Sequence, residues 1–285
     1  VKAPIAEAQL LETLIMNRIG LQTMLASKAA RVVAAAQGRT VVDFAGRRMH
    51  GLDAAINGAR AFYIAGVHAT ANCQAGAVYG LPTAGTMAHS FIQSFDDEAA
   101  AFQAFAEAFP GTTLLVDTYD TLRGVDRVIA LIRHAGLSVG AVRLDSGDMA
   151  ALAREARARL DDAGLRDVQI FASGGLDEDR IARLLDDGAP IDGFGVGTAM
   201  GVSDDAPALD IAYKLVSYGG EGRAKTSPGK ASLPGPKQVY RAMDEGRACG
   251  DTLATATESG QQGAPLLETV IRDGQRTRPA PRLDD

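Results

Sequence analysis

Cysteine and long apolar runs are both scarce in this sequence. Only 2 of its 285 residues are cysteine, Cys73 and Cys249. Two cysteines are too few for the disulfide framework of a secreted domain, so we expect a reducing, cytoplasmic setting. No apolar stretch approaches the roughly 20 residues that a bilayer-spanning helix needs. The composition therefore argues against a disulfide scaffold and predicts no association with a membrane.

Positive charge is in deficit as well. The 29 lysines and arginines are outnumbered by 35 aspartates and glutamates, which gives a net charge of −6 with neutral histidines. This balance argues against nucleic acid as a partner. Hydrophobic residues make up 46% and charged residues 22%, as in globular rather than disordered chains. The length is sufficient for one large domain or two smaller ones.

An initiator methionine and a leader pattern are missing from the start. The sequence begins at Val1 and shows no charged segment followed by an apolar one. Apolar residues recur at steps of three and four between Pro4 and Gln37, which predicts a long helix that Gly38 ends. We therefore expect Val1 to lie inside a longer architecture.

Several common catalytic signatures are missing too. The sequence has no P-loop, no G-x-S-x-G motif and no dinucleotide-binding fingerprint. It has no cysteine and histidine cluster with the spacing of a zinc site. The candidates for chemistry instead follow predicted strands.

An alternation of strands and helices fills most of the sequence. Continuous apolar strands separated by helices are typical of a parallel sheet covered on both faces. The predicted strands are 40–44, 81–84, 113–116, 139–144, 168–171 and 191–196, and the predicted helices are 52–65, 69–79, 120–135, 149–163 and 178–187. Residues 209–218 suit either a strand or a helix. An open doubly wound sheet would give the same alternation, but we favour a β/α barrel, whose strand ends converge on one face.

The segment Val142–Asp148 (VRLDSGD) carries the sharpest local signal. Because side chains alternate along a strand, Arg143 and Asp145 should lie on the same side. A buried arginine–aspartate pair is costly unless it serves a purpose. Two readings stay open: a site for an anionic substrate with a metal or a cationic intermediate, and a salt bridge that closes the barrel.

Glycine-rich segments follow the last two strands, at 171–176 (FASGGL) and 193–198 (GFGVGT). Glycines let backbone N–H groups approach a ligand closely, and phosphate sites of β/α barrels commonly use the loops after the late strands. Tight turns also require glycine. Two such loops in succession favour a phosphate site.

Three further segments hold candidate side chains. Phe44 in DFAGRR (43–48) suits stacking on a flat ring, and Arg47 suits phosphate binding, although for this motif alone a core phenylalanine and solvated arginines are the favoured reading. His89 in GTMAHS (85–90) is a candidate with a structural alternative. Asp117 follows a strand and suits either Mg²⁺ held through water or a capping role.

Taken together, these segments resemble the nicotinate phosphoribosyltransferases, of the type II phosphoribosyltransferase family. The resemblance rests on blocks in the family's order: 6–13 (AEAQLLET), 43–48, 85–90, 142–148, 171–176, 193–198 and 233–241 (LPGPKQVYR). It implies an α/β fold with an irregular β/α barrel and a partial α/β sandwich domain. The implied parts are a joining helical segment at 1–38, the barrel at 39–205, and a segment at 206–285 that returns to the incomplete sandwich. Residues before Val1 would complete that domain.

The resemblance also implies a reaction. Nicotinate would attack phosphoribosyl pyrophosphate to give nicotinate mononucleotide and pyrophosphate in NAD biosynthesis or salvage, with ATP as co-substrate and Mg²⁺ neutralising the leaving group. The transition state resembles an oxocarbenium ion and needs electrostatic stabilisation more than a protein nucleophile. A homodimer with composite active sites is implied. The alternatives are a non-catalytic or regulatory nucleotide-binding remnant, and a transferase for nicotinamide or quinolinate.

The resemblance assigns catalytic roles to three residues. Arg143 would favour the nicotinate carboxylate, Asp145 would face the ribose and the reacting carbon, and ATP would phosphorylate His89. The phosphorylation of His89 would couple ATP hydrolysis to synthesis.

The resemblance assigns binding roles to further residues. Phe44 would stack on the pyridine ring, Arg47 would contact the diphosphate or a phosphate, and Asp117 would lie in the metal region. Asn72 stands where amide-using relatives carry aspartate, which fits nicotinate. The ribose 5-phosphate would be held by Ser173, Gly174, Gly175, Gly195, Gly197 and Thr198.

Overall fold

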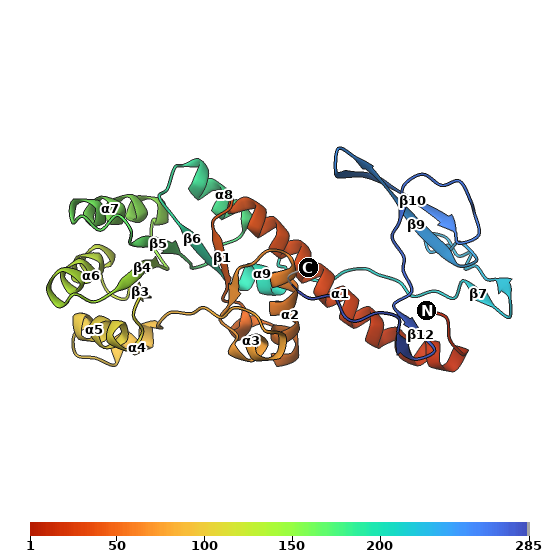
Figure 1. The fold of residues 1–285 in the computed structure, drawn as a ribbon, viewed down its shortest axis with the longest axis horizontal. Helices are drawn as coiled ribbons and strands as arrows, with labels where there is room; N and C mark the ends of the chain where they lie inside the picture. Colours follow the sequence, from red (N-terminus) through yellow and green to blue (C-terminus); the bar gives the residue numbers. More distant parts are fainter. Residues whose placement is uncertain (284–285) are drawn as a thin grey trace. The chain divides into compact units, whose positions relative to one another are not determined.

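The computed structural model describes residues 1–283 (Figure 1). The chain divides into two compact units, Thr13–Asp210 and the combination of Val1–Glu12 with Ile211–Asp285. Helix α1 (Ile5–Ala35) contributes residues to both. The predicted division at 1–38, 39–205 and 206–285 stays a prediction, and its last two residues lie outside the described part.

A curled parallel sheet forms the centre of the larger unit, as the strand and helix alternation predicts (Figure 1). Within residues 1–283 its six strands run in the order β2-β1-β6-β5-β4-β3, so the expected barrel is present as a half-barrel with β2 and β3 at its edges. The strands are β1 (Thr40–Asp43), β2 (Ala69–Thr70), β3 (Thr112–Leu115), β4 (Val139–Leu144), β5 (Gln169–Ala172) and β6 (Gly193–Val196).

Three helices that connect the strands, α6 (Thr121–Ala135), α7 (Met149–Asp162) and α8 (Glu178–Asp186), begin and end within one residue of their predicted ranges. Asp120, Asp148 and Asp177 each accept a hydrogen bond from the backbone N–H three residues on and so cap α6, α7 and α8. Gly136 ends α6 in the left-handed region, with φ of 65°. The helices are η1 (Gly46–Arg48), α2 (Leu52–Ile64), α3 (Cys73–Tyr79), α4 (His89–Gln93), α5 (Glu98–Ala108), α6 (Thr121–Ala135), α7 (Met149–Asp162), α8 (Glu178–Asp186) and α9 (Thr198–Val202).

The core lies on both faces of this sheet. Leu114, Leu115 and Val116 are consecutive in and just after β3, and none is exposed, so both faces of the strand are covered. Buried residues of the helices complete the layers, such as Val125 of α6 and Leu160 of α7. This packing fixes where each strand ends and therefore where the polar residues that follow it lie.

Three sequence predictions need correction. Residues 69–79 are not one helix: Ala69 pairs with Val42 in the short strand β2, and α3 begins only at Cys73. The predicted strand 81–84 reduces to one bridge between Thr83 and Thr70. Of residues 209–218, only Ser217–Tyr218 (β7) is regular, because this segment packs no continuous apolar face.

The smaller unit is built from antiparallel strands. Its main hairpin pairs β9 with β10, and across it Arg241 and Asp251 form two hydrogen bonds of 2.8 Å. Ala254 is the one buried apolar side chain in the described part of this unit. Its strands are β7, β8 (Glu221–Gly222), β9 (Lys237–Asp244), β10 (Arg247–Thr255), β11 (Ala264–Pro265), β12 (Ile271–Arg272) and β13 (Gln275–Arg276). No helix among residues 1–283 is long and apolar enough to cross a membrane.

Candidate active site

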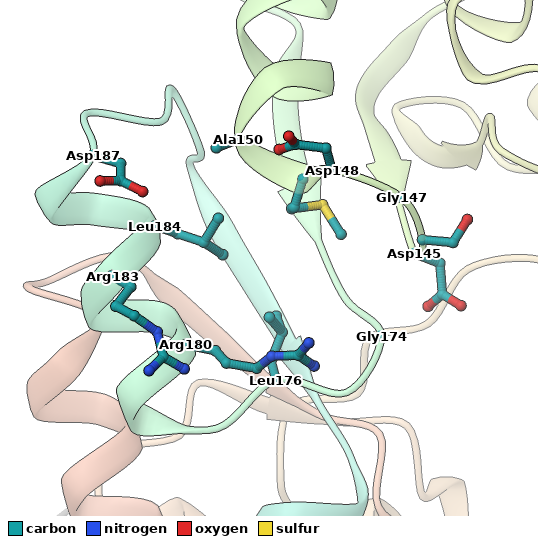
Figure 2. A pocket seen from close by; sticks show the side chains of 12 residues that line it. Asp145, Gly147, Asp148, Ala150, Gly174, Leu176, Arg180, Arg183, Leu184 and Asp187 are labelled. Atoms are coloured by element: carbon teal, nitrogen blue, oxygen red, sulfur yellow. The ribbon is translucent and has the colours of Figure 1, made fainter.

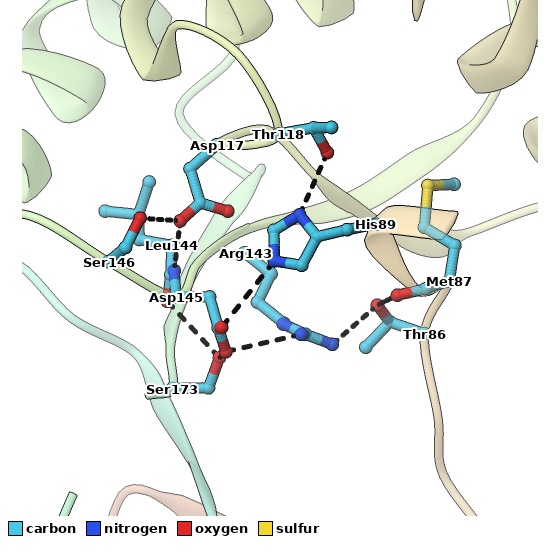
Figure 3. A network of polar contacts seen from close by, with 10 residues as sticks. All are labelled: Thr86, Met87, His89, Asp117, Thr118, Arg143, Leu144, Asp145, Ser146 and Ser173. Carbon is cyan, nitrogen blue, oxygen red and sulfur yellow. Dashed lines mark hydrogen bonds and ion pairs between the residues drawn. The ribbon is translucent and has the colours of Figure 1, made fainter. Parts of the chain in front are cut away.

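A cluster of hydrogen-bonded side chains lies at the carboxyl ends of β3, β4 and β5 (Figure 3). Parallel strands bring these ends to one edge of the sheet, where ligand sites of β/α folds form. We call this cluster the strand-end network. Its members are Thr86, His89, Asp117, Thr118, Arg143, Asp145, Ser146 and Ser173.

Arg143 and Asp145 form the centre of the strand-end network. They lie on the same side of β4, as the period of two predicts, with 3.3 Å between Arg143 Nη2 and Asp145 Oδ1. Arg143 Nη1 donates to Thr86 Oγ1 at 3.1 Å, and Ser173 Oγ donates to Asp145 Oδ1 at 2.5 Å. The pair is therefore held from both sides by hydroxyl groups.

The electrostatics keep both partners charged. Burial alone would raise the pKa of Asp145, but the hydrogen bond from Ser173 and the charge of Arg143 outweigh it, so this pKa lies below its usual range. Burial lowers the pKa of Arg143, and the carboxylates of Asp145 and Asp117 oppose that change. A guanidinium remains protonated at neutral pH. The site thus presents a fixed cation beside a fixed anion.

His89 joins the strand-end network from the first position of α4. Its Nδ1 lies 3.1 Å from Thr118 Oγ1, and its Nε2 lies 3.7 Å from Asp145 Oδ2. The side chain is 41% exposed, so a ligand can reach the ring. The structure thus brings His89 and Asp145, two of the three residues with expected catalytic roles, to one place.

Asp117 braces the turn after β4. Its Oδ2 accepts from the backbone N–H of Asp145 at 3.1 Å and from Ser146 Oγ at 2.5 Å. Its Oδ1 is buried and finds no hydrogen-bond partner among the described residues, and the same holds for Arg143 Nε. The strand-end network therefore keeps one acceptor and one donor unused.

The residues present fit Mg²⁺ only as an ion shared with a substrate. Residues 1–283 contain no group of three histidine, cysteine or acidic side chains that could hold a metal alone. Mg²⁺ commonly takes one or two carboxylates and completes its shell with phosphates and water. The unused Oδ1 of Asp117 is the oxygen best suited to such an ion.

Phe44 provides a flat apolar surface beside the strand-end network. It follows β1 directly, and the Arg143 guanidinium lies 5.6 Å from its ring centroid. The Phe171 ring is tilted against it at 6.4 Å. A Cβ at Gly195 would overlap the Phe44 ring, so glycine is required there to seat this ring. Gly195 thus has a packing reason of its own, beside the phosphate role that the resemblance implies.

The two glycine-rich loops differ in how they use glycine. Gly174 and Gly175 have φ of 86° and 61°, a region that favours glycine, and both are exposed. A Cβ at Gly174 would overlap the carbonyl oxygen of Asp145, so this turn packs directly on the strand-end network. Gly197 and Thr198 follow β6, and Thr198 Oγ1 accepts from Arg48 Nη1 at 2.8 Å.

The remaining predicted site residues lie farther from the centre. Arg47 is exposed on η1, close enough for its charge to act on Arg143. Asn72 caps α3, because its Oδ1 accepts from Ala75 N–H at 3.1 Å, and no hydrogen bond links it to the strand-end network within residues 1–283. Sequence reasoning missed Arg48 and Thr118. Arg48 had a signal, as the neighbour of Arg47, whereas the contact of Thr118 joins residues 29 positions from each other.

An open pocket of about 580 Å³ adjoins the strand-end network (Figure 2). Asp145 and Gly174 form its edge toward the network, and residues of the first turn of α7 and of one face of α8 form the walls. Arg180 reaches from α8 to the glycine turn, where its Nη1 donates to the Gly175 carbonyl at 2.6 Å. The pocket therefore places free volume next to Asp145 and the exposed glycines.

Comparison with known proteins agrees with the family resemblance of the sequence. The family described as "Quinolinate phosphoribosyl transferase, C-terminal domain" matches residues 25–214. Nicotinate phosphoribosyltransferase pncB2 of Mycobacterium tuberculosis is 60% identical over 99% of this chain and 61% of its own length. Nicotinate phosphoribosyltransferase of Bos taurus is 30% identical over 99% of this chain and 68% of its own. The chain belongs to the nicotinate phosphoribosyltransferase family.

Solved structures agree with this membership. Human nicotinic acid phosphoribosyltransferase superposes with a TM-score of 0.84 at 27% identity, over 99% of this chain and 70% of that one. Nicotinate-nucleotide pyrophosphorylase of Pyrococcus furiosus superposes with a TM-score of 0.81 at 30% identity, over 96% of this chain and 70% of that one. These neighbours confirm the type II phosphoribosyltransferase fold. The chain spans 61% of the length of the Mycobacterium tuberculosis relative.

Proposed function

We propose that this family member transfers the phosphoribosyl group of phosphoribosyl pyrophosphate to nicotinate, giving nicotinate mononucleotide and pyrophosphate for NAD biosynthesis. The observation that carries the proposal is the placement of Arg143 between the Phe44 ring and the Asp145 carboxylate. The first face of this arrangement, formed by Phe44 and Arg143, suits a flat ring with a negative charge. The second face, formed by Asp145, suits a developing positive charge.

Nicotinate has both features that the first face requires. Its pyridine ring can pack on the Phe44 ring in an offset or tilted stack. Its carboxylate can accept hydrogen bonds from the Arg143 guanidinium, whose Nε is buried and unpartnered among the described residues. The neutral amide of nicotinamide would gain less from this cation.

Asp145 suits the second face. As the C–O bond to pyrophosphate breaks, positive charge develops at the anomeric carbon, and a fixed carboxylate nearby stabilises it. The lowered pKa keeps Asp145 ionised at neutral pH, and Ser173 and Arg143 hold its orientation. No protein nucleophile is needed, because nicotinate itself forms the new C–N bond.

The phosphates of the second substrate have two candidate anchors. The exposed turn of Gly174 and Gly175 can direct backbone N–H groups to a phosphate. Arg48, Thr198 and the nearby Arg47 bring two guanidinium groups and a hydroxyl to the end of β6. Asp117 would hold Mg²⁺ together with the diphosphate, and the ion would neutralise the leaving group.

We extend the proposal to ATP, assembly and location. His89 is the proposed phosphoryl acceptor from ATP, because its ring is exposed and held beside Asp145. A homodimer is proposed from the family resemblance, and a cytoplasmic location from the two free cysteines.

The test is a product assay on the purified chain. It is incubated with phosphoribosyl pyrophosphate, Mg²⁺ and one of nicotinate, nicotinamide or quinolinate, with and without ATP, and mononucleotides are separated by chromatography. We expect product from nicotinate, more of it with ATP, and no ATP stimulation in His89→Ala. If the chain prefers nicotinamide or quinolinate, nicotinate is not its substrate and the proposal is wrong on this point. Calorimetric binding of nicotinate mononucleotide without any turnover would favour a non-catalytic nucleotide-binding protein.

A further inference from the structure

Thr118 belongs to the strand-end network but has no role in the proposed reaction. We propose that Thr118 is a positioning residue: its hydroxyl fixes the His89 ring so that Nδ1 is the unprotonated, nucleophilic nitrogen. The catalytic consequence rests on the proposed phosphorylation of His89, whereas the orientation of the ring rests on the geometry alone.

The geometry holds the His89 ring at both nitrogens (Figure 3). Nδ1 lies 3.1 Å from Thr118 Oγ1, in the loop after β3, and Nε2 lies 3.7 Å from Asp145 Oδ2, at the end of β4. These contacts come from opposite edges of the ring. A ring turned by 180° about its Cβ–Cγ bond would lose both.

The two contacts select one tautomer. A carboxylate offers only negative charge and acceptor oxygens, so Asp145 Oδ2 at 3.7 Å favours the proton on the nitrogen that faces it, Nε2. A neutral imidazole has one proton, and Nδ1 is then an acceptor for the Thr118 hydroxyl. Because a hydroxyl both donates and accepts, it can turn and keep the contact when the ring gains a second proton.

This arrangement suits phosphoryl transfer from a nucleoside triphosphate. The Nδ1 lone pair forms a bond to the terminal phosphorus, the bond from that phosphorus to its bridging oxygen breaks, and the nucleoside diphosphate leaves with the electron pair. No proton has to leave Nδ1. The phosphorylated ring then carries positive charge, which the Asp145 carboxylate faces through Nε2–H. The Thr118 hydroxyl releases Nδ1 and becomes a donor to a phosphoryl oxygen.

Nitrogen NMR of the full chain with ring-labelled histidine tests the tautomer directly. The sequence has four histidines, so His89→Gln assigns the signal of interest. The spectra are recorded at about pH 8.5, about two units above the reference histidine pKa. We expect the wild-type signal of an unprotonated Nδ1 and a protonated Nε2. A wild-type ring with the proton on Nδ1 overturns the proposal even if no variant folds.

Two substitutions at Thr118 separate positioning from packing. Thr118→Val keeps the shape and removes the hydroxyl, and we expect a mixture of tautomers and a roughly tenfold slower phosphorylation of His89 by ATP. Thr118→Ser should restore both. Thr113→Val in β3 is the control for a threonine outside the strand-end network and should leave both unchanged.

The experiments test the positioning role of Thr118 separately from the proposed phosphorylation of His89 by ATP. A wild-type tautomer in Thr118→Val, or a serine variant that behaves like the valine variant, overturns the positioning role. Absence of phosphohistidine in the wild type refutes the ATP role of His89, and the NMR signals still decide what Thr118 does.

Discussion

Two clusters of charge in the larger unit invite comparison, because each surrounds a shielded cation with acidic groups. In the first, Lys28 Nζ lies 2.8, 3.0 and 2.9 Å from carboxylate oxygens of Glu178, Asp204 and Asp205, and the lysine side chain is 3% exposed. We call this the α1 ion cluster. In the strand-end network, Arg143 is 13% exposed and has one carboxylate partner, at 3.3 Å.

The difference lies in unused hydrogen-bonding capacity. The ammonium of Lys28 has three partners for its three protons, whereas the Nε of Arg143 is buried without a partner in the described part of the chain. Each cluster also holds a buried carboxylate oxygen without a hydrogen-bond partner, Asp117 Oδ1 and Glu178 Oε2, but Glu178 Oε2 lies 2.8 Å from Lys28 Nζ. Leaving a buried polar atom unsatisfied costs about 1–3 kcal/mol. A ligand that completes those bonds recovers this free energy on binding. Buried charge alone therefore does not mark a site, whereas an unused donor on a buried cation, as at Arg143 Nε, suits an anionic ligand.

The largest effect is expected where the strand-end network is broken at its anion. Asp145→Asn removes the charge that faces the reacting carbon and should lower kcat by about 10²–10³-fold. The free energy of unfolding should fall by about 1–3 kcal/mol, because Arg143 loses its one carboxylate partner while asparagine still accepts the hydrogen bond from Ser173. Steady-state kinetics and urea unfolding measure the two effects. The control is Asp126→Asn, which removes an aspartate from an exposed pair with Arg159. Equal losses in both variants would contradict the assignment.

In the α1 ion cluster we expect a substitution to lower the stability and to leave the activity nearly unchanged. Lys28→Met leaves three acidic side chains without their shared cation and should lower the free energy of unfolding by about 3 kcal/mol. The kinetic constants should stay within about twofold below the unfolding transition. Arg18→Met is the matched control, because it breaks an exposed ion pair with Asp53 and should cost at most about 1 kcal/mol. A kinetic defect in folded Lys28→Met would erase the distinction between the two clusters.

The sequence predicts those features that depend on local spacing. The pairing of Arg143 with Asp145 follows from the period of two in a strand, and the ranges of α6, α7 and α8 follow from the alternation of strands and helices. The strand β2 could not be predicted this way. Its two residues, Ala69 and Thr70, are extended because β1 offers them partners, so tertiary context overrides the local pattern.

Side-chain partners across the sheet were equally beyond the sequence. Thr118 meets His89 and Arg48 meets Thr198 only because the sheet curls and its strands end together, over separations of 29 and 150 residues. Local sequence could have indicated one further contact: the spacing of Asn72 to Ala75 is that of a helix cap, and its Oδ1 accepts from the Ala75 N–H. The ligand-binding role that the resemblance implies for Asn72 stays a prediction.

A smaller effect should separate the aromatic surface from the charged centre of the site. Phe44→Leu keeps an apolar side chain and removes the flat ring, so the KM for nicotinate should rise about five- to tenfold, the equivalent of roughly 1 kcal/mol of ring stacking. The KM for phosphoribosyl pyrophosphate should stay unchanged. Phe105→Leu, in an aromatic contact between α4 and α5, is the control. A rise in both KM values would mean that Phe44 maintains the structure of the site rather than binding nicotinate directly.

The smallest effect concerns the acid response of the α1 ion cluster. Burial alone would raise the pKa of Glu178, but hydrogen bonds from Lys28 and Arg31 outweigh it and hold the pKa below its ordinary 4.5. Between the two values the unfolded chain binds more protons, so this contribution to stability is complete above about pH 4.5 and is lost as the pH falls through the folded value. Lys28→Met removes most of this stabilisation by ionised Glu178 already at neutral pH. The gap in urea midpoint between wild type and Lys28→Met should therefore narrow from pH 7 to about pH 4. A gap that stays constant would mean that Lys28 stabilises the chain through its packed methylene groups rather than through its charge.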